Sequence, residues 1–190
     1  MRDVLRIETK RLVLRPLVGG GRKCDGQRVA GFLADFDVAR MTSSIPSPYP
    51  PVAAEGWLML MRARARLNED FVFAIDLPGE GLIGCIGAHV KAAQNSIGYW
   101  IGKPFWGSGF ASEALLGFVA EAESLGDLHA GHFTDNPASG RVLEKAGFKP
   151  TGKIEKVFSI ARGKASSCRE LLRRVRAQPA EDELAEAVAC

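Results

Sequence analysis

The sequence contains no long hydrophobic run. No apolar stretch approaches the roughly 18 residues that a membrane-spanning helix needs, and the charged segment 1–8 is too polar for a secretory signal. We therefore expect no membrane partner and a cytoplasmic location. A hydrophobic content of 46% in 190 residues is ordinary for a globular chain, and this length suffices for one domain with a sizeable core.

Cysteine is scarce and scattered. The cysteines lack the paired spacing of a zinc site and the density of a disulfide scaffold, so we expect no metal and read as free thiols Cys24, Cys85, Cys168 and Cys190. The net charge of +3 does not by itself indicate a nucleic-acid partner. A Rossmann dinucleotide enzyme is also excluded, because no Gly-x-Gly-x-x-Gly follows an N-terminal strand and no βαβ unit repeats.

The apolar pattern predicts alternating elements without an internal repeat. Period-two alternation and turn residues predict strands over residues 12–17, 71–75, 82–89, 96–101 and 129–134. Helical spacing predicts helices over residues 27–36, 57–65 and 109–125. In the second helix, we expect Arg62, Arg64 and Arg66 to face water. Residues 39–51 contain four prolines and cannot form regular structure.

The most informative segment is IGYWIGKPFWGSGFASEAL at residues 97–115, which joins a β-type run to a helix through a glycine turn. Gly107 and Gly109 have no Cβ, so the backbone can turn tightly and bring its N–H groups against an anion. The following helix adds unpaired donors and the positive end of its dipole. The segment indicates a phosphate cradle, although glycines between a strand and a helix are more often plain turn residues.

A second segment, TDNPASGRVLEKAGF at residues 134–148, reads as a short helix with both ends marked. Asn136 is a natural N-cap, Pro137 suits the first helical position and Gly147 fits the stop. Together, the two segments resemble the GNAT acyltransferase family, and in particular its RimJ/RimL-like branch. That branch carries Trp-Gly-x-Gly-x-Ala-x-Glu-Ala, then Asn-Pro-Ala-Ser and Leu-Glu-Lys-x-Gly-Phe. The opening ETKRLVLRP at residues 8–16 is also typical of it.

The resemblance implies an α/β domain of the GNAT fold over residues 1–176. The expected architecture is a mixed central β-sheet with helices on both faces and a V-shaped splay between two parallel strands, here 96–101 and 129–134. Residues 177–190 fall outside the resemblance and read as an acidic C-terminal tail, helical or disordered. We read the basic stretch 162–176 before it as a solvated final strand rather than a nucleic-acid or ribosome contact.

The donor that the resemblance implies is acetyl-CoA. Its pantetheine arm would lie in the V, with the amide of Ile101 facing the thioester carbonyl and Asn136 hydrogen-bonding the arm. The resemblance assigns the pyrophosphate to the backbone amides of six consecutive residues: Trp106, Gly107, Ser108, Gly109, Phe110 and Ala111. One departure is Pro104, where many GNAT loops carry Gln or Arg, so a little direct pyrophosphate contact is expected to be missing.

The chemistry of the family is direct attack of an amine on the thioester. It requires a deprotonated amine, donors for the developing oxyanion and a stabilised thiolate. The resemblance places the hydroxyl of Ser139 near the coenzyme sulfur, which makes it the catalytic candidate. The alternative is structural, because Asn136 can simply cap its helix and Ser139 can donate within the first turn.

Two residues are candidates for the acceptor site. Tyr49 lies in the proline-rich loop that covers this pocket in the family, and Glu113 belongs to the RimJ/RimL-like pattern. A tyrosine between prolines can equally be a packing anchor, and a carboxylate in a first helical turn is stabilised by the dipole without any functional role. No carboxylate base is visible beside the splay, because Ser96 stands where related sequences often place an acid. Histidines at strand ends are more often structural than catalytic, which weakens three further candidates: His89, His129 and His132.

The sequence therefore predicts an N-acetyltransferase that acts on a primary amine. Without an evident base near Ser96, an amine that is partly neutral at pH 7 is the best acceptor, so we expect a protein or peptide N-terminal α-amine. Tyr49, the 39–51 loop and residues 160–166 would form the opening. A small amine (a polyamine, aminoglycoside or amino acid) is the alternative acceptor, and a non-catalytic acyl-CoA-binding module is the alternative of another class. A homodimer is left open.

Overall fold

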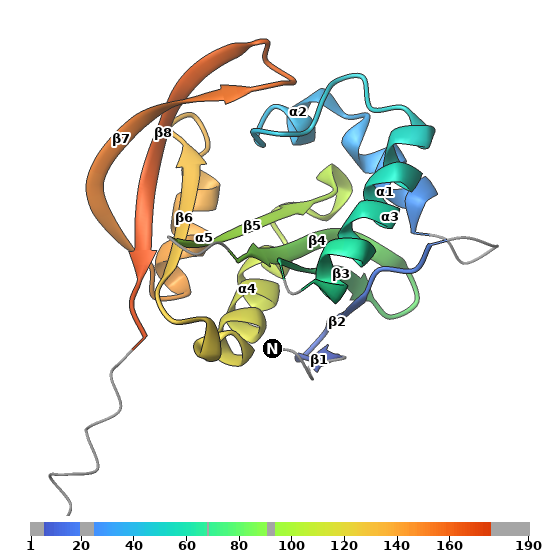
Figure 1. Cartoon of the computed structure of the whole chain (residues 1–190), viewed down its shortest axis with the longest axis horizontal. Helices are drawn as coiled ribbons and strands as arrows, with labels where there is room; N and C mark the ends of the chain where they lie inside the picture. The colour runs from blue at the N-terminus through green and yellow to red at the C-terminus, as the bar shows by residue number, and fades with distance from the viewer. Residues whose placement is uncertain (1–5, 20–24, 68, 91–93, 176–190) are drawn as a thin grey trace, which may run out of the picture.

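The computed structural model describes residues 6–19, 25–67, 69–90 and 94–175, and its centre is a mixed sheet with the order β1-β2-β3-β4-β5-β6-β8-β7 (Figure 1). The strands are β1 (Ile7–Glu8), β2 (Val13–Pro16), β3 (Asp70–Leu77), β4 (Gly81–His89), β5 (Asn95–Ile101), β6 (Leu128–Phe133), β7 (Lys149–Ser159) and β8 (Lys164–Arg173). The helices are α1 (Gly26–Leu33), α2 (Phe36–Ala39), α3 (Pro51–Arg66), α4 (Phe110–Glu121) and α5 (Pro137–Lys145), with 3-10 turns η1 (Lys103–Phe105) and η2 (Glu123–Leu125).

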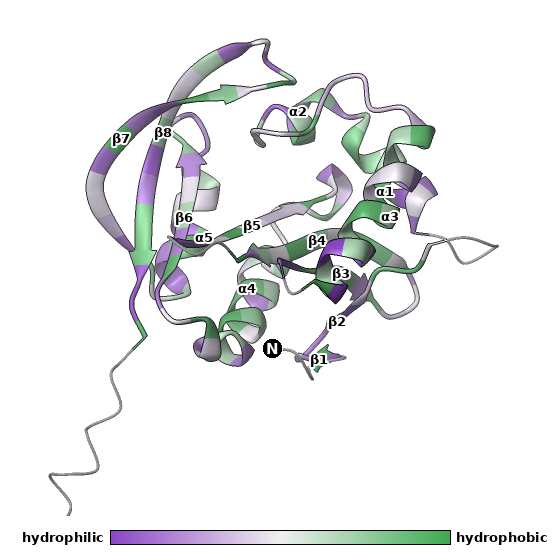
Figure 2. Cartoon of the chain, viewed as in Figure 1, coloured by the Kyte–Doolittle hydropathy of each residue, from purple (hydrophilic) through white to green (hydrophobic). Residues whose placement is uncertain are grey.

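Helices cover both faces of this sheet, as the resemblance implies. On one face, α1 and α3 enclose an apolar cluster that includes Leu82 and Cys85 of β4. On the other face, α4 and α5 enclose a second cluster around the fully buried Phe118. Figure 2 shows hydrophobic residues concentrated along β4, whereas the outer strand β7 carries many hydrophilic ones. The sheet is therefore the layer between two cores.

The two parallel strands, β5 and β6, pair over a very short distance. Asn95 is in register with Leu128 and Ser96 with His129, and among the described residues no further pair joins these strands. Beyond Ser96, β6 instead follows β8 in antiparallel register as far as Phe133. The predicted V-shaped splay is confirmed, and its open end lies toward Ile101 (Figure 1).

The predicted ends of the two site-forming helices are also confirmed. Gly109 has a φ of 80° and directly precedes α4. At α5, the side chain of Asn136 accepts a hydrogen bond from the N–H of Ser139, and Pro137 opens the helix. Gly147, with a φ of 87°, follows its end. Left-handed φ values favour glycine because it has no Cβ, so the sequence fixes these junctions locally.

Two predicted helices need correction. The helix expected over residues 27–36 is divided into α1 and α2, because Asp35 adopts an extended conformation and caps α2 by accepting the N–H of Asp37. In α3, Ala65 is exposed, although the predicted apolar face included it. Arg64 does not simply face water, since its Nε lies 2.7 Å from the fully buried carboxylate of Asp70.

Residues 40–50 have no helix or strand, as predicted for most of the proline-rich segment 39–51, but Ala39 ends α2 and Pro51 opens α3. The helix α3 therefore begins earlier than the helix expected over residues 57–65. The tip of the β7–β8 hairpin holds this segment, because the N–H of Ile160 donates to the carbonyl of Ser43 at 3.0 Å. The hydroxyl of Ser159 donates to the carbonyl of Thr42 at 2.8 Å. Cys85 and Cys168 are free thiols, whereas Cys24, Cys190 and the predicted tail 177–190 lie outside the described residues.

Candidate active site

The V between β5 and β6 opens into a cleft of about 1210 Å³. One end of the cleft is lined by the glycine turn and by α5, with Ile101, Asn136 and Ser139 among the lining residues. The other end is lined by segment 41–45, α3 and β4, with Tyr49 and His89. An elongated ligand in the V would therefore reach both faces of the sheet.

The glycine turn has the geometry of an anion cradle. Gly107 and Gly109 have φ values of 76° and 80°, which side chains rarely tolerate. Gly109 is also the N-cap of α4 and supplies no capping side chain, so the first amides of the helix are donors without a side-chain partner. One expectation needs correction: the N–H of Trp106 donates to the carbonyl of Lys103 at 3.2 Å. It is engaged within its own turn.

A guanidinium group stands beside this cradle. Arg11 donates from Nη2 to the carbonyl of Ser108 at 3.1 Å and lies 4.4 Å over the ring of Phe110. Its Nε is 2.7 Å from Oε2 of Glu113. Pro104 offers no cation to this turn, and the guanidinium beside it comes from the N-terminal segment, where it is paired with the Glu113 carboxylate.

Glu113 is occupied by the same N-terminal segment. Its carboxylate accepts hydrogen bonds from the Thr9 hydroxyl at 2.7 Å and from the Arg11 N–H at 2.6 Å. Burial raises the pKa of the Glu113 carboxyl, but these hydrogen bonds outweigh burial and the pKa is lowered from its ordinary value. Glu113 does not belong to the described lining of the cleft. Its predicted part in the acceptor site stays a prediction. Its hydrogen bonds hold Arg11, which contacts the glycine turn at Ser108.

The backbone of Ile101 points into the V. The N–H of Gly102 donates to the carbonyl of Ile83 at 2.8 Å, one residue beyond the register pair of Gly84 with Ile101. This pattern makes Gly84 and Ile101 a non-hydrogen-bonded pair, so the Ile101 N–H faces away from β4 and toward the open side of β5. The Ile101 carbonyl accepts the indole N–H of Trp106 at 2.7 Å, which fixes the strand end to the turn.

Asn136, Ser139 and Tyr99 form a hydrogen-bonded group at the glycine-turn end of the cleft. The Oδ1 of Asn136 accepts the N–H of Ser139 at 3.2 Å. Asn136 therefore caps α5, which was the structural alternative to a role in binding the coenzyme. The Ser139 hydroxyl is 2.8 Å from the Tyr99 hydroxyl. Burial raises the pKa of Tyr99 to about 12, although the bond with Ser139 opposes the rise. The phenol therefore remains protonated at neutral pH and can relay a proton.

The end of the cleft opposite the glycine turn is lined by residues of the proline-rich segment. The Tyr49 side chain is buried, with 8% of the residue exposed, and its hydroxyl is 3.5 Å from the carbonyl of Ala53. Burial raises the pKa of this phenol. Tyr49 lines the cleft, so its packing role and its predicted position at the acceptor pocket are both compatible with this geometry.

An ion cluster closes one edge of the cleft. Asp135, which lines it, pairs with Arg162 of the hairpin at 2.8 Å and with Arg40 at 3.3 Å. The hydrogen bond from Arg162 lowers the pKa of Asp135. Arg162 also donates to the carbonyl of Arg40 at 2.6 Å. These contacts join the hairpin, the helix α2 end and the strand end after β6 into one rim.

The histidines have three different environments. His132 faces the carbonyl of Phe133 at 2.9 Å through Nδ1, and His129 faces Glu170 at 3.2 Å. His89 lines the cleft, and its Nδ1 is 2.5 Å from Oδ1 of Asp70.

Within the part of the chain that the structure describes, no group of three or more histidine, cysteine, aspartate or glutamate side chains could hold a metal ion. In the same part, no helix is long and apolar enough to cross a membrane.

Sequence reasoning missed Arg11, Tyr99 and the pairing of His89 with Asp70. Arg11 and Tyr99 both lie inside the segments that carried the resemblance, but their side-chain partners come from 102 and 40 residues away. For His89, the available signal was its place at a strand end opposite Ser96. Together, the cleft combines an anion cradle, strand amides that face an extended ligand, hydroxyl groups and an imidazole, which suits transfer of an acyl group from a phosphate-bearing thioester.

Comparisons with known proteins agree with this chemistry. Residues 11–149 match the family described as acetyltransferase (GNAT) domain. The uncharacterized N-acetyltransferase YoaA of Bacillus subtilis (strain 168) is 42% identical over 79 residues, which are 38% of this chain and 45% of that protein. The match thus spans less than half the length of this curated relative.

Solved structures share the architecture. RimJ of Mycobacterium smegmatis in complex with CoA-disulfide superimposes with a TM-score of 0.75 at 22% identity, covering 96% of this chain and 94% of that one. RimL, a ribosomal L7/L12 alpha-N-protein acetyltransferase in complex with coenzyme A, gives a TM-score of 0.74 at 14% identity, with 91% and 99% coverage. At these identities, the likeness establishes the fold.

Proposed function

The chain belongs to the GNAT acetyltransferase family and carries an acetyl-CoA-dependent N-acetyltransferase domain; from this premise, we propose that it acetylates the N-terminal α-amine of a protein or peptide. The observation that carries the proposal is the course of the cleft, which runs from the glycine turn through the V to the proline-rich segment. A donor at the first end and an amine at the second would meet in the V.

The donor would be held mainly by backbone. Four of the predicted residues, Ser108 to Ala111, offer amides at the start of α4, and Arg11 adds a cation at the pyrophosphate. Gly107 permits the close approach. The N–H of Ile101 would hydrogen-bond the thioester end of the arm, and the Nδ2 of Asn136 would donate to an amide carbonyl of pantetheine.

The chain's own groups would then assist the attack. An amine entering beneath Tyr49 attacks the carbonyl carbon, the C–N bond forms and the C–S bond breaks. The Ser139 hydroxyl, itself hydrogen-bonded to Tyr99, would stabilise or protonate the departing thiolate. Tyr99, which keeps its proton at neutral pH, would hold the Ser139 hydroxyl in place by a hydrogen bond, and the proton that reaches the thiolate would come from the attacking nitrogen through Ser139.

The choice of an α-amine rests on protonation. At pH 7, an α-amino group with a pKa near 7.8 is about 14% neutral, whereas a lysine side chain with a pKa near 10.4 is about 0.04% neutral. This difference amounts to roughly 3.4 kcal/mol. Ser96 offers no carboxylate that would overcome the lysine penalty. A ribosomal-protein α-N-acetyltransferase among the solved structures is a further support for this class of acceptor.

The test is a competition between two peptides with acetyl-CoA present. One peptide has a free N-terminus and no lysine, and the other has a blocked N-terminus and one lysine. We expect the first to be acetylated preferentially, as measured by mass spectrometry. Preference for the lysine peptide, or for a polyamine, aminoglycoside or free amino acid added in the same mixture, would overturn the proposed acceptor. Binding of acetyl-CoA without transfer to any amine would favour the non-catalytic module.

A further inference from the structure

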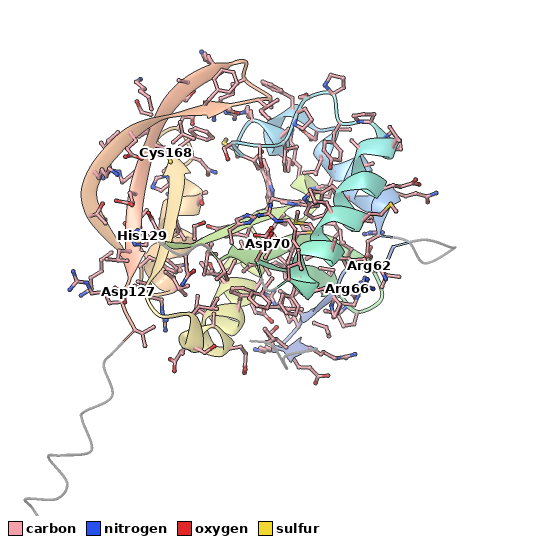
Figure 3. All side chains as sticks on the ribbon, viewed as in Figure 1. Arg62, Arg66, Asp70, Asp127, His129 and Cys168 are labelled. Carbon is pink, nitrogen blue, oxygen red and sulfur yellow. The ribbon has the colours of Figure 1, made fainter. Side chains whose placement is uncertain are left out.

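Polar residues in register form a row across four strands. Asp70 of β3 is in register with His89 of β4, His89 with Ser96 of β5, and Ser96 with His129 of β6. Registered neighbours project from the same face of a sheet. The ion pair between Asp70 and Arg64 of α3 identifies this as the α3 face, and Figure 3 shows Asp70 near the centre of the molecule. The row places an imidazole directly beside Ser96, where the sequence offers no carboxylate.

The contacts of His89 fix which of its nitrogens can accept a proton. Nδ1 lies 2.5 Å from Oδ1 of Asp70, and an ionised carboxylate only accepts hydrogen bonds, so Nδ1 is the nitrogen that carries the hydrogen. In the neutral ring, the lone pair is then on Nε2. Asp70 is 0% exposed and held also by Arg64, whereas the His89 side chain is 46% exposed. Asp70 therefore anchors the pair in the interior, and His89 is the member that is exposed to the cleft.

We propose that His89 is the proton acceptor of the transferase, with Asp70 as its positioning residue; this inference rests on the proposed function. The neutral Nε2 takes a proton from the ammonium form of the acceptor through a chain of water molecules, because His89 is in register with Ser96, roughly 16 Å along β5 from Ile101. The amine nitrogen attacks the thioester carbonyl, and the thiolate of coenzyme A leaves. A second proton from the attacking nitrogen goes to the thiolate through the Ser139 hydroxyl, and His89 releases the first to solvent.

A nitrogen base also suits the proposed acceptor. An α-amine with an ordinary pKa near 7.8 gives up its proton far more readily than a lysine ammonium with a pKa near 10.4. The charged groups around His89 are Asp70 from β3, Glu69 before it and Arg64 from α3, and Arg64 pairs with both carboxylates.

The same row contains an internal control. His129 also faces a carboxylate, since its Nδ1 is 3.2 Å from Glu170, but its side chain and that of Glu170 are 27% and 23% exposed. His129 is not part of the cleft lining in the described residues. A role that consists only of pairing on the sheet would apply to both histidines alike, whereas a role in the cleft would apply to His89 alone.

The experiment compares His89→Gln and Asp70→Asn with the control His129→Gln. For each, kcat is measured against pH from about 5.5 to 9.5 on the free-N-terminus peptide, and coenzyme A binding is measured by calorimetry. We expect His89→Gln to lower kcat at pH 7 by roughly 100-fold, within the usual range for a lost general base. The variant should lose the histidine-dependent limb of the profile and bind coenzyme A within about twofold of the parent. His129→Gln should retain the parental profile.

Two further variants test whether Asp70 positions His89 and guard against a variant that fails to fold. Asp70→Asn should lower kcat by about tenfold or more, because a neutral amide can hold the wrong tautomer of His89. Should Asp70→Asn not fold, His89→Ala decides instead, since added imidazole should restore part of its rate, and it should not accelerate the His129→Gln control. A parental pH profile in His89→Gln, or no rescue of a folded His89→Ala variant, would overturn the inference.

Failure of the inference is distinguishable from failure of the proposed function. If the enzyme acetylates a small amine or lysine instead, the proposed acceptor is wrong, but the same profiles on that amine still test His89. If the parent acetylates the N-terminal peptide and His89→Gln keeps its kcat and profile, the proposed function stands and the base assignment falls.

Discussion

The hydroxyl of Tyr99 lies 2.8 Å from Oγ of Ser139, across the boundary between β5 and α5. The phenol is also 3.2 Å from the Ser139 carbonyl, to which it can donate. Tyr99 carries one hydroxyl hydrogen, so when it donates to the carbonyl, the Ser139 hydroxyl can donate to the phenol oxygen. Two residues that the sequence separates by 40 positions thus act as one hydrogen-bonded unit in the cleft.

Substitution of Ser139 should affect turnover more than coenzyme binding. In Ser139→Ala, we expect kcat to fall by about ten- to a thousand-fold, because a hydroxyl that assists a leaving thiolate acts mainly in the transition state. The dissociation constant of coenzyme A, measured by calorimetry, should change much less. Tyr99→Phe should lower kcat in the same direction. Ser124→Ala, at an exposed position of η2 outside the cleft lining, is the control; a kcat of Ser139→Ala within about twofold of the parent would make Ser139 structural.

A carboxylate at the cradle should abolish donor binding. Gly109→Glu adds a negative charge and a side chain where φ is 80° and where Arg11 Nη2 would be 3.6 Å from the new Cβ. We expect calorimetry to detect no acetyl-CoA binding, because the charge repels the pyrophosphate and the side chain blocks the backbone. The control is Gly79→Glu, which has a φ of 92° and open space around it in the β3–β4 turn. Normal affinity in a folded Gly109→Glu protein would remove the pyrophosphate from this turn.

Glu113 should make the protein sensitive to acid. Its pKa is lowered in the folded protein, so its stabilising contribution is present above the unfolded pKa of about 4.3 and is lost as the pH falls through the lower folded pKa. Glu113→Gln should reduce the free energy of unfolding by about 1–3 kcal/mol at pH 7, the cost of charge-assisted hydrogen bonds to Thr9 and Arg11. Urea unfolding at pH 7 and at pH 3 measures both states. An equal loss in the variant at the two pH values would contradict this account.

Two substitutions of Tyr49 distinguish a packing role of its ring from a hydrogen-bonding role of its hydroxyl. Its hydroxyl has a weak contact with Ala53 at 3.5 Å, whereas its ring is buried in the α1–α3 core. We expect Tyr49→Phe to leave the KM of the acceptor within about twofold, and Tyr49→Ala to raise it at least tenfold and to destabilise the protein by about 3 kcal/mol or more. Steady-state kinetics and thermal unfolding distinguish these effects. A large KM increase in Tyr49→Phe would instead show that the phenol contacts the acceptor.

Several features of the site follow from short stretches of sequence. Gly107 and Gly109 predict the turn, and Asn136 and Pro137 predict the start of α5, because left-handed backbone and helix caps depend on the residue itself and its near neighbours. The splay between β5 and β6 was predicted from the resemblance. The division of α1 from α2 at Asp35 was missed although its signal is local, since Asp35 caps α2 by accepting the N–H of Asp37. The pairing of the buried Asp70 with His89 was not predicted, because it depends on the register of β3 with β4.

The sequence by itself indicated the family through its resemblance, and it predicted most of the strands and helices, but not β1, α2 or β7. It also identified the two segments that line the glycine-turn end of the cleft, because caps and glycine positions are local properties of a sequence. The cytoplasmic location stays a prediction. The tertiary structure decided which side chains meet: Arg11 with Glu113, Tyr99 with Ser139, and Asp70 with His89. These pairs depend on strand register and on the packing of helices across a sheet, which bring together residues far apart in the chain, and no local pattern specifies that register.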